Sequence, residues 1–475
     1  MPATTSFRDP GGFCVAVDGR FLRVVAPDHV APLEAFLNCE CARKFLAAGS
    51  LVGTRLLSKP EVTQWLQHAE FSQALRGRPI GAVFEHDRIA FPSFPCEWGP
   101  EMLHAAAELT LELAVNALKC GYNLKDATPT NILFRGTKPV FVDVLSFEPR
   151  VLGESVWRPY AQFVRTFLLP LLVNKYWGTS LAEIFTTRRD GLEPQELYAK
   201  CTWLQKIRLP FLSLITIPTL LAKKGESAGR ANVPASCDDE KSLFILASLF
   251  SRLRSSLRSL KPTSTKRAAW SRYMETHSYE QQAFAAKEAF VREALAEFKP
   301  NKVLDIGANT GHFSRIAAAL GMEVVAIDAD PDCAAEGFMR ARAEKLSLLP
   351  LVVDVTRPTP ALGWRNSECE SFLDRARRHF DAVLMLALVH HLQVTERVPL
   401  RDIFDFAAEL TNSVLVIEFV PLEDAMFQRL LRGREALFAG YNRQVFEEAF
   451  QRRFEITRSA ELSGTGRRLY LLKKK

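Results

Sequence analysis

Hydrophobic and polar positions follow two different periods in the first half of this chain. From 13 to 25, the run FCVAVDGRFLRVV alternates with a period of two around Asp18-Gly19, which predicts two strands joined by a tight turn. Residues 32–48 and the run EMLHAAAELTLELAVNALKCGY have apolar residues at helical spacing, and the second run ends at Gly121. A short hairpin follows, and the pattern from 157 to 222 is mostly helical. We therefore predict a mixed α+β domain.

The pattern changes twice in the second half. Residues 223–241, KKGESAGRANVPASCDDEK, are polar, rich in small residues and aperiodic, as in a linker. Helical periodicity returns from 242 to 299, and after Pro300 short strands alternate with helices. We therefore divide the chain into a front domain (1–222), a linker (223–241), a helical lead-in (242–299) and an α/β domain (300–475).

Composition limits the class of protein. The 475 residues are 48% apolar and 24% charged, which is typical of soluble globular chains, and the net charge is 61 − 54 = +7. The nine cysteines show no C-x-x-C pair and no His/Cys cluster, so neither a zinc site nor a disulfide framework is expected, and a reducing cytoplasm fits best. The most apolar stretch, 209–224, is shorter than the ~20 residues of a membrane span. Its Lys-rich flank leaves a peripheral membrane contact open.

The clearest chemistry lies in VLDIGANTGHFSRIAAALG (303–321). A strand enters a glycine turn and leaves it as a helix, and Gly307 and Gly311 allow the backbone to turn sharply and approach a ligand. The next strand, EVVAIDAD, brings Asp328 to its end, where a carboxylate can accept hydrogen bonds from both hydroxyls of a ribose. These residues suit a dinucleotide and S-adenosylmethionine (SAM) equally well.

Three further features favour SAM. The turn reads D-x-G-x-N-x-G from Asp305 to Gly311, the third strand ends in Asp354 within reach of an adenine amine, and FEITRSAEL with RRLYLLKK predicts a closing hairpin. With these features, residues 300–475 resemble the class I SAM-dependent methyltransferases, whose Rossmann-like, seven-stranded sheet has a reversed final strand. The resemblance implies a SAM site formed by Asp305, Gly307, Asn309, Gly311, Asp328 and Asp354. The alternative is a doubly wound domain that binds another nucleotide or none.

The acceptor side of the site is predicted from the next two strands. The run DAVLMLALVHHL brings His390 and His391 to the carboxyl edge of the sheet, and SVLVIEFVP brings Glu418 there. Methyl transfer from a sulfonium needs alignment and no metal, but a hydroxyl acceptor also needs a base, which histidine suits. Adjacent side chains point apart, so one histidine at most faces the acceptor, and we place His391 ahead of His390. The alternative is that both histidines are structural.

Missing motifs narrow the acceptor class. No N/D-P-P-Y/F sequence ends the fourth strand, which argues against an amide nitrogen, so an oxygen of a small molecule or saccharide is favoured. The stretch GWRNSECESF (363–372) is expected either to line the acceptor pocket or to cap the cofactor.

The front domain contains a motif that points to a different reaction from methyl transfer. The runs KDATPTNILF and VFVD resemble the catalytic loop and metal-binding strand of protein kinases and aminoglycoside phosphotransferases. That resemblance implies Asp126 as the base and Asn131 and Asp143 as metal ligands. Leu124 stands where the motif has histidine, and no lysine lies in a strand resembling V-A-I-K. We predict a degenerate kinase-like α+β domain, with a phosphotransferase or nucleotide-binding protein as the alternative.

The whole chain resembles a bacterial family that joins a kinase-like front half to a class I methyltransferase and includes a host-specific nodulation protein of rhizobia. SFRDPGGF, VLDIGANTG, LALVHHL and IEFVP carry this resemblance together with the motifs above. It implies methyl transfer, with a lipo-oligosaccharide signal or its precursor as one acceptor.

The basic run 251–273 offers a different partner. It has seven Lys/Arg and no acidic residue, as in an RNA-binding patch of an RNA methyltransferase. A solvated helix face is the favoured interpretation, so no nucleic-acid partner is expected. Trp270, Tyr273, His277 and Tyr279 lead into the helix before the glycine turn. The resemblance implies that this segment folds over the cofactor as a lid, and the alternative is that these rings pack between the domains.

Overall fold

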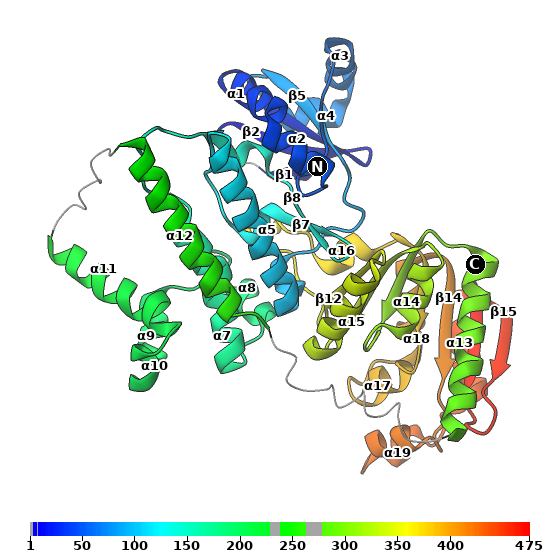
Figure 1. Cartoon of the computed structure of the whole chain (residues 1–475). Coiled ribbons are helices and arrows are strands. Elements are labelled where there is room, and N and C mark those ends of the chain that lie inside the picture. Colours follow the sequence, from blue (N-terminus) through cyan, green and yellow to red (C-terminus); the bar gives the residue numbers. More distant parts are fainter. Residues whose placement is uncertain (1–2, 7, 229–237, 263–277) are drawn as a thin grey trace. The chain divides into compact units, whose positions relative to one another are not determined.

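A computed structural model describes residues 3–6, 8–228, 238–262 and 278–475 (Figure 1). The chain divides into two compact units. Unit 1 contains residues 1–134, 139–263 and 361–370, and unit 2 contains residues 135–138, 264–360 and 371–475. Each unit has its own hydrophobic core.

Unit 1 begins with a five-stranded antiparallel sheet. Its strands lie in the order β1 (Ala3–Ser6), β2 (Gly12–Val17), β3 (Arg20–Val25), β5 (Ala82–His86) and β4 (Thr54–Leu56). Both central residues of the turn from β2 to β3 have positive φ, 49° at Asp18 and 73° at Gly19, so the predicted hairpin is confirmed. Alternate residues of these strands, such as Phe13, Val15 and Leu22, form the buried core of the sheet.

The rest of unit 1 is mostly helical. The single helix predicted for 32–48 is two helices, because the chain is extended at Cys39 (φ −74°, ψ 161°). Two strand pairs follow the long helix α5 (Pro100–Lys119). Strand β6 (Tyr122–Leu124) pairs with β9 (Phe147–Pro149), and the hairpin of β7 (Ile132–Arg135) and β8 (Lys138–Phe141) lies between them in the chain. The main helices are α1 (Pro27–Asn38), α2 (Glu40–Ala47), α3 (Lys59–Gln67), α4 (Ala69–Leu75), α5 (Pro100–Lys119), α7 (Leu169–Trp177), α8 (Leu181–Thr187), α9 (Pro194–Lys200), α10 (Trp203–Ile207), α11 (Ile217–Ala228) and α12 (Asp239–Ser259).

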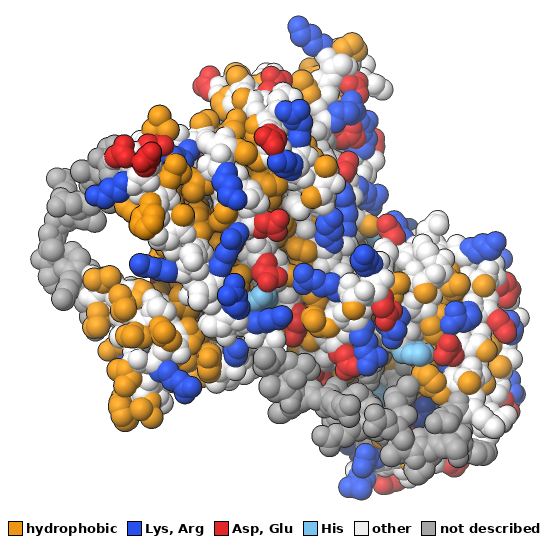
Figure 2. All heavy atoms as spheres, in the orientation of Figure 1, with side chains coloured by type: hydrophobic (Ala, Val, Ile, Leu, Met, Phe, Trp, Pro, Cys, Tyr) orange, Lys and Arg blue, Asp and Glu red, His pale blue; other side chains and the backbone are white. Residues whose placement is uncertain are grey.

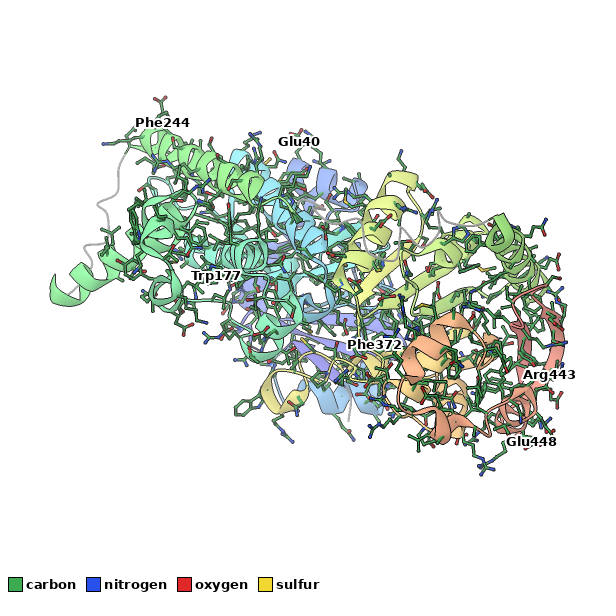
Figure 3. The ribbon with its side chains drawn as sticks, turned by 90° about the horizontal axis from the view of Figure 1, so that it is seen from below. Glu40, Trp177, Phe244, Phe372, Arg443 and Glu448 are labelled. Atoms are coloured by element: carbon green, nitrogen blue, oxygen red, sulfur yellow. The ribbon has the colours of Figure 1, made fainter. Side chains whose placement is uncertain are left out.

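Helix α12 packs on α5 and so belongs to unit 1, although the sequence placed it in the lead-in to the second domain. His104 Nε2 lies 3.2 Å from the Leu257 carbonyl oxygen, and Lys175 Nζ donates to the Ser259 carbonyl oxygen at 2.8 Å. At the other end of α12, Phe244 points away from the helix into solvent (Figure 3). Residues 229–237 of the predicted linker lie outside the described residues, and α11 continues to Ala228. Among the helices that the structure describes, none is both long enough and apolar enough to span a membrane.

Unit 2 is built on a seven-stranded sheet in the order β12-β11-β10-β13-β14-β16-β15. Strands β10 to β14 pair in parallel, and β16 pairs antiparallel with both of its neighbours, so the predicted terminal hairpin and reversed strand are confirmed. The strands are β10 (Lys302–Ile306), β11 (Glu323–Asp328), β12 (Leu348–Val352), β13 (Phe380–Met385), β14 (Thr411–Phe419), β15 (Phe454–Glu461) and β16 (Arg468–Lys474).

Helices cover both faces of this sheet because its strands are apolar on both sides. On strand β16, Leu469 and Leu471 join the core beneath α13, whereas Tyr470 packs against the phenyl rings of Phe446 and Phe450. Figure 1 shows α13 lying across β14. The helices are α13 (Ser278–Phe298), α14 (His312–Ala319), α15 (Pro331–Glu344), α16 (Phe372–Ala376), α17 (Val389–Val394), α18 (Leu400–Leu410), α19 (Ala425–Leu431) and α20 (Arg443–Phe450).

Candidate cofactor and acceptor site

A glycine turn joins β10 to α14 at the carboxyl edge of the unit 2 sheet. Gly307, Asn309 and Gly311 all have positive φ, at 71°, 53° and 78°. A Cβ atom at Gly307 would lie 3.1 Å from Leu388 Cδ1, so a side chain at this position would press on the neighbouring loop. The backbone N–H groups of residues 307 and 308 both donate to the Ile327 carbonyl oxygen, at 2.9 and 3.0 Å. The turn is therefore held against the end of β11.

Asp328, the last residue of β11, is oriented by this turn. Its Oδ2 accepts the N–H of Asn309 at 2.7 Å and its Oδ1 accepts the N–H of Asp330 at 2.9 Å. Each carboxylate oxygen keeps a second lone pair, so the group can still accept hydrogen bonds from a diol. The side chain is partly exposed, and burial raises its pKa. This geometry suits the ribose of a nucleoside cofactor.

Asp305 lies beneath the turn and not at its surface. The side chain is buried, and Ser314 Oγ donates to Asp305 Oδ2 at 2.5 Å. Burial raises the pKa of Asp305 to about 6, against the hydrogen bond from Ser314 and the nearby charge of Lys287. Asp305 therefore supports the turn through Ser314, one turn into α14.

The raised pKa of Asp305 predicts a pH dependence of stability. The folded state keeps a proton that the unfolded chain loses at pH 3.8, so the free energy of unfolding should fall as pH rises from about 4 to about 6, by on the order of 2 kcal/mol. Urea unfolding across this range checks it. Asp305→Asn should remove this decline, whereas Asp402→Asn, on the exposed side of α18, should keep it. A decline that survives Asp305→Asn would assign it to another group.

Asp354, predicted to reach an adenine amine, is held by its own loop. Strand β12 ends two residues earlier, at Val352. One oxygen of Asp354 accepts the backbone N–H and the hydroxyl of Thr356, at 2.9 and 2.6 Å, and the other accepts Arg357 Nε at 3.0 Å. Burial raises the pKa of Asp354, but these hydrogen bonds outweigh burial and lower it. An adenine amine would have to share the second oxygen with Arg357.

The two histidines lie on the short helix α17 and not on an extension of the fourth strand. Strand β13 ends at Met385, and the chain turns at Ala387, where φ is 51°. His390 is 2% exposed and stacks on Phe427 with ring centroids 5.6 Å apart, and burial lowers its pKa to about 3. His391 is half-buried, and burial lowers its pKa from the ordinary value. His391 is therefore the more accessible of the two side chains.

Three buried polar atoms beside these histidines have no hydrogen-bond partner among the described residues: His390 Nδ1, Gln393 Oε1 and the Tyr441 hydroxyl. Phe427 links two of them, since its ring lies 5.6 Å from His390 and 5.3 Å from Tyr441. An unpaired polar atom is costly to bury, so each of these atoms would gain from a polar ligand.

Glu418 is enclosed in an ion network. The side chain is fully buried, Lys287 Nζ lies 2.5 Å from its Oε2, and Arg467 Nη1 lies 3.2 Å from its Oε1. Arg467 also pairs with Asp424 at 2.8 Å. Burial opposes the charged form, but the charges of Lys287 and Arg467 outweigh it and lower the pKa of Glu418. Because both oxygens are engaged, Glu418 positions this edge of the sheet and is unsuited to take a proton.

Neither cation of this network, Lys287 or Arg467, was predicted from the sequence. Lys287 continues the buried stripe of α13, between Ala283 and Phe290, at the spacing of one helical turn. A lysine on an otherwise apolar helix face was the signal that could have predicted a buried anionic partner.

The GWRN segment belongs to unit 1 by its contacts. Glu368 is nearly buried and pairs with Arg8, whose Nε lies 2.6 Å from its Oε1, and with Arg189. Its Oε2 also accepts the N–H of Trp364 at 2.8 Å. The described contacts of this segment therefore fix its fold within unit 1, and its predicted role at the acceptor or cofactor stays a prediction.

Each of the predicted phosphotransfer residues of unit 1 contacts a neighbouring side chain, and Asp143 also pairs with a cation. Arg23, buried on β3, pairs with Asp143 at 3.0 Å, and Ser146 Oγ donates to the same carboxylate at 2.5 Å. Asn131 Nδ2 lies 3.4 Å from Ser146 Oγ, and Asp126 lies 3.4 Å from Gln162 Nε2. In the described ranges, no three His, Cys, Asp or Glu side chains are grouped as metal ligands would be. Arg23 thus places a positive charge on the carboxylate that the resemblance gave to a metal.

Two predictions fall partly outside the described residues. The basic run 251–273 is described only to residue 262, and the proposed lid residues Trp270 and Tyr273 are not described.

Comparison with known proteins adds to this geometry. Residues 279–453 match a family model described as a methyltransferase domain, and this match begins within α13. The chain is 29% identical over 470 residues to the nodulation protein NoeA of Rhizobium meliloti (strain 1021), covering 98% of this chain and 94% of that protein.

Two solved structures are also similar. The N-methyltransferase NodS from Bradyrhizobium japonicum WM9, in complex with S-adenosyl-L-homocysteine, is 14% identical with a TM-score of 0.32, covering 46% of this chain and 97% of NodS. The magnesium protoporphyrin IX methyltransferase from Synechocystis PCC 6803 is 16% identical with a TM-score of 0.31, covering 42% of this chain and 89% of that one.

Proposed function

We propose that this chain transfers a methyl group from SAM to an oxygen of a small molecule or saccharide. The observation that carries the proposal is the glycine turn at 307–311, which is locked onto Asp328 inside a region that matches a methyltransferase domain. The name of the relative NoeA links that protein to nodulation, and this supports a saccharide signal such as a lipo-oligosaccharide as the acceptor.

The residues at the sheet edge fit SAM. The turn is free of side chains at Gly307 and Gly311, the first backbone N–H groups of α14 are available to a carboxylate, and Asp328 has lone pairs for a ribose. SAM supplies a methyl group on a positively charged sulfur. The protein aligns the acceptor oxygen with that methyl group, and His391 takes the proton from the acceptor hydroxyl. Two of the unpaired atoms, His390 Nδ1 and the Tyr441 hydroxyl, belong to rings that pack on Phe427, and both would gain from a polar contact with the acceptor.

His391→Ala tests the base. We expect the rate of methyl transfer to fall by about 10²–10⁴-fold, while SAM affinity stays unchanged. A base works in its neutral form, and burial lowers the pKa of His391, so the parent rate should fall only below the ordinary histidine pKa near 6.5. Transfer of labelled methyl groups to a saccharide extract, measured against pH, checks both points.

Two variants serve as controls for the histidines. His379 lies just before β13, at the opposite end of that strand from α17. His379→Asn should keep both the parent rate and its fall at low pH. His390→Asn should keep the fall in rate at low pH and change the KM for the acceptor. If the fall in rate at low pH disappeared in His390→Asn and persisted in His391→Ala, His390 would be the base and His391 would not.

For unit 1 we propose a kinase-like fold without phosphotransfer. Arg23 neutralises Asp143, so a metal-bound nucleotide would have to displace this buried guanidinium. Such a unit is suited to recognising the acceptor or supporting the fold.

The deciding experiment is calorimetric titration of the full chain with SAM and, separately, with Mg-ATP. Heat with SAM and none with Mg-ATP is the expected result. Heat with Mg-ATP alone would overturn both proposals and favour the phosphotransferase. Binding of RNA that weakens as the salt concentration rises would instead favour RNA as the methyl acceptor.

A further inference from the structure

A surface of unit 1 exposes large apolar side chains at an unusual density. Within residues 203–221, each of the seven is 46–71% exposed: Trp203, Leu204, Ile207, Leu209, Ile217, Leu220 and Leu221. We call these seven residues the α10–α11 face. Figure 2 shows hydrophobic side chains gathered over the part of the chain that Figure 1 labels α9, α10 and α11. Single exposed apolar residues are ordinary, but a contiguous group marks an interaction surface.

The spacing shows that the face is organised by helices. Trp203, Leu204 and Ile207 lie within one turn of α10, and Ile217, Leu220 and Leu221 lie within one turn of α11. Residues at i, i+3 and i+4 share one side of a helix. Both helices therefore turn an apolar stripe outward, which is the reverse of a surface helix that packs on a core.

The same segment already has a core of its own. Phe211, Leu214 and Ile215 are buried between the helices. Thr216 Oγ1 donates to the Lys206 carbonyl oxygen at 2.7 Å and ties α10 to the turn before α11. A capping box of Thr202 and Gln205 fixes the start of α10. The outward apolar residues are thus additional to the residues that fold the segment.

The charges around the face are of one sign. From Lys200 to Ala222 the sequence has three Lys/Arg (200, 206 and 208) and no Asp or Glu, and we call these three cations the Lys/Arg rim. Lys206 Nζ lies 4.1 Å from the ring centroid of Tyr198, so this cation lies at the edge of the face. The nearest acids on the preceding chain, Glu193 and Glu196, already pair with Arg165 and Arg188.

We infer that the α10–α11 face docks on the surface of an anionic lipid membrane. Apolar side chains enter the boundary between headgroups and acyl chains, Trp203 suits that boundary, and the Lys/Arg rim meets the lipid phosphates. In this arrangement α10 and α11 lie at the membrane surface, and no helix spans the membrane.

A second copy of the chain fits this face less well. In a two-fold dimer the same patch faces itself, so two copies of the Lys/Arg rim would meet, and residues 200–222 supply no acidic side chain to separate them. Like charges across an interface cost free energy. Anionic headgroups remove this repulsion, which is why the observations favour a lipid surface. The inference is independent of methyl transfer and does not use any residue of unit 2.

Vesicle sedimentation of the full chain tests the inference. With vesicles of equal parts phosphatidylglycerol and phosphatidylcholine, the parent should sediment, and with phosphatidylcholine alone it should bind much more weakly. Leu220→Ser/Leu221→Ser should weaken binding by about tenfold or more, since both side chains would otherwise leave water. Lys200→Glu/Arg208→Glu should weaken binding at low salt and by less at high salt.

A matched control is available in the same unit. Leu66 and Leu152 are also exposed and lie outside the α10–α11 face, so Leu66→Ser/Leu152→Ser should bind like the parent. Because all four leucines are exposed, both double variants should unfold at the parent's urea midpoint, which separates lost docking from lost folding.

Two results would overturn the inference. One is vesicle binding that Leu220→Ser/Leu221→Ser does not change. The other is a parent that does not sediment with vesicles but forms a dimer that the same substitutions dissociate, which would assign the face to a second copy.

Discussion

Asp328→Ala is expected to abolish SAM binding while unit 2 stays folded. The carboxylate would accept two hydrogen bonds from the ribose, and each hydrogen bond to a charged group is worth about 1.5–3 kcal/mol, so affinity should fall on the order of 100-fold or more. The fold should persist because residues 307 and 308 still donate to the Ile327 carbonyl oxygen. Calorimetry of SAM binding and far-UV circular dichroism measure the two effects.

The control for this substitution lies four residues along the chain. Asp332 is exposed in the first turn of α15, and Asp332→Ala should leave SAM affinity at the parent value. If Asp328→Ala bound SAM as the parent does, the cofactor would have to lie elsewhere on unit 2.

The second large effect is expected on stability, from Lys287→Met. The substitution leaves the fully buried Glu418 with Arg467 as its one remaining cation among the described residues, and breaking a buried ion pair typically costs about 3–5 kcal/mol. Urea unfolding should show a loss of about 3 kcal/mol in the free energy of unfolding of unit 2. Lys287→Met/Glu418→Gln should recover part of that loss, because no uncompensated charge then remains at this position.

A surface pair on the same helix provides the comparison. Arg292 and Glu288 pair at 3.0 Å in an exposed setting, so Arg292→Met should cost less than about 1 kcal/mol. Equal losses for Lys287→Met and Arg292→Met would show that the buried network does not stabilise the unit. The pKa of Glu418 is lowered in the folded state, so its stabilisation is present above its unfolded pKa and is lost as pH falls through the lower folded value.

Features encoded over a few neighbouring residues could be predicted from the sequence. The Asp18-Gly19 turn, the glycine turn at 307–311 and the terminal hairpin each depend on local chemistry, and the structure has all three. The seven-stranded sheet of unit 2 with its reversed final strand followed from the resemblance that these local features supported.

Features that join distant residues could not be predicted. Lys287 and Glu418 are 131 positions apart, and Arg23 and Asp143 come from separate hairpins, so no local pattern indicates either pair. The helical periodicity from 242 to 299 predicted a helical segment but not that α12 would pack on α5. The histidines were placed on a strand because the positive φ at Ala387, which turns the chain into α17, has no signal in an alanine.

The two units exchange short segments, since 361–370 groups with unit 1 and 135–138 groups with unit 2. A single cut between residues 263 and 264 would leave Arg8 and Arg189 of the front fragment without the carboxylate of Glu368. The same cut would deprive the second fragment of Gly136, whose backbone approaches the Leu346 carbonyl oxygen. A fragment made by that cut would therefore lack a short segment that groups with it in the intact chain.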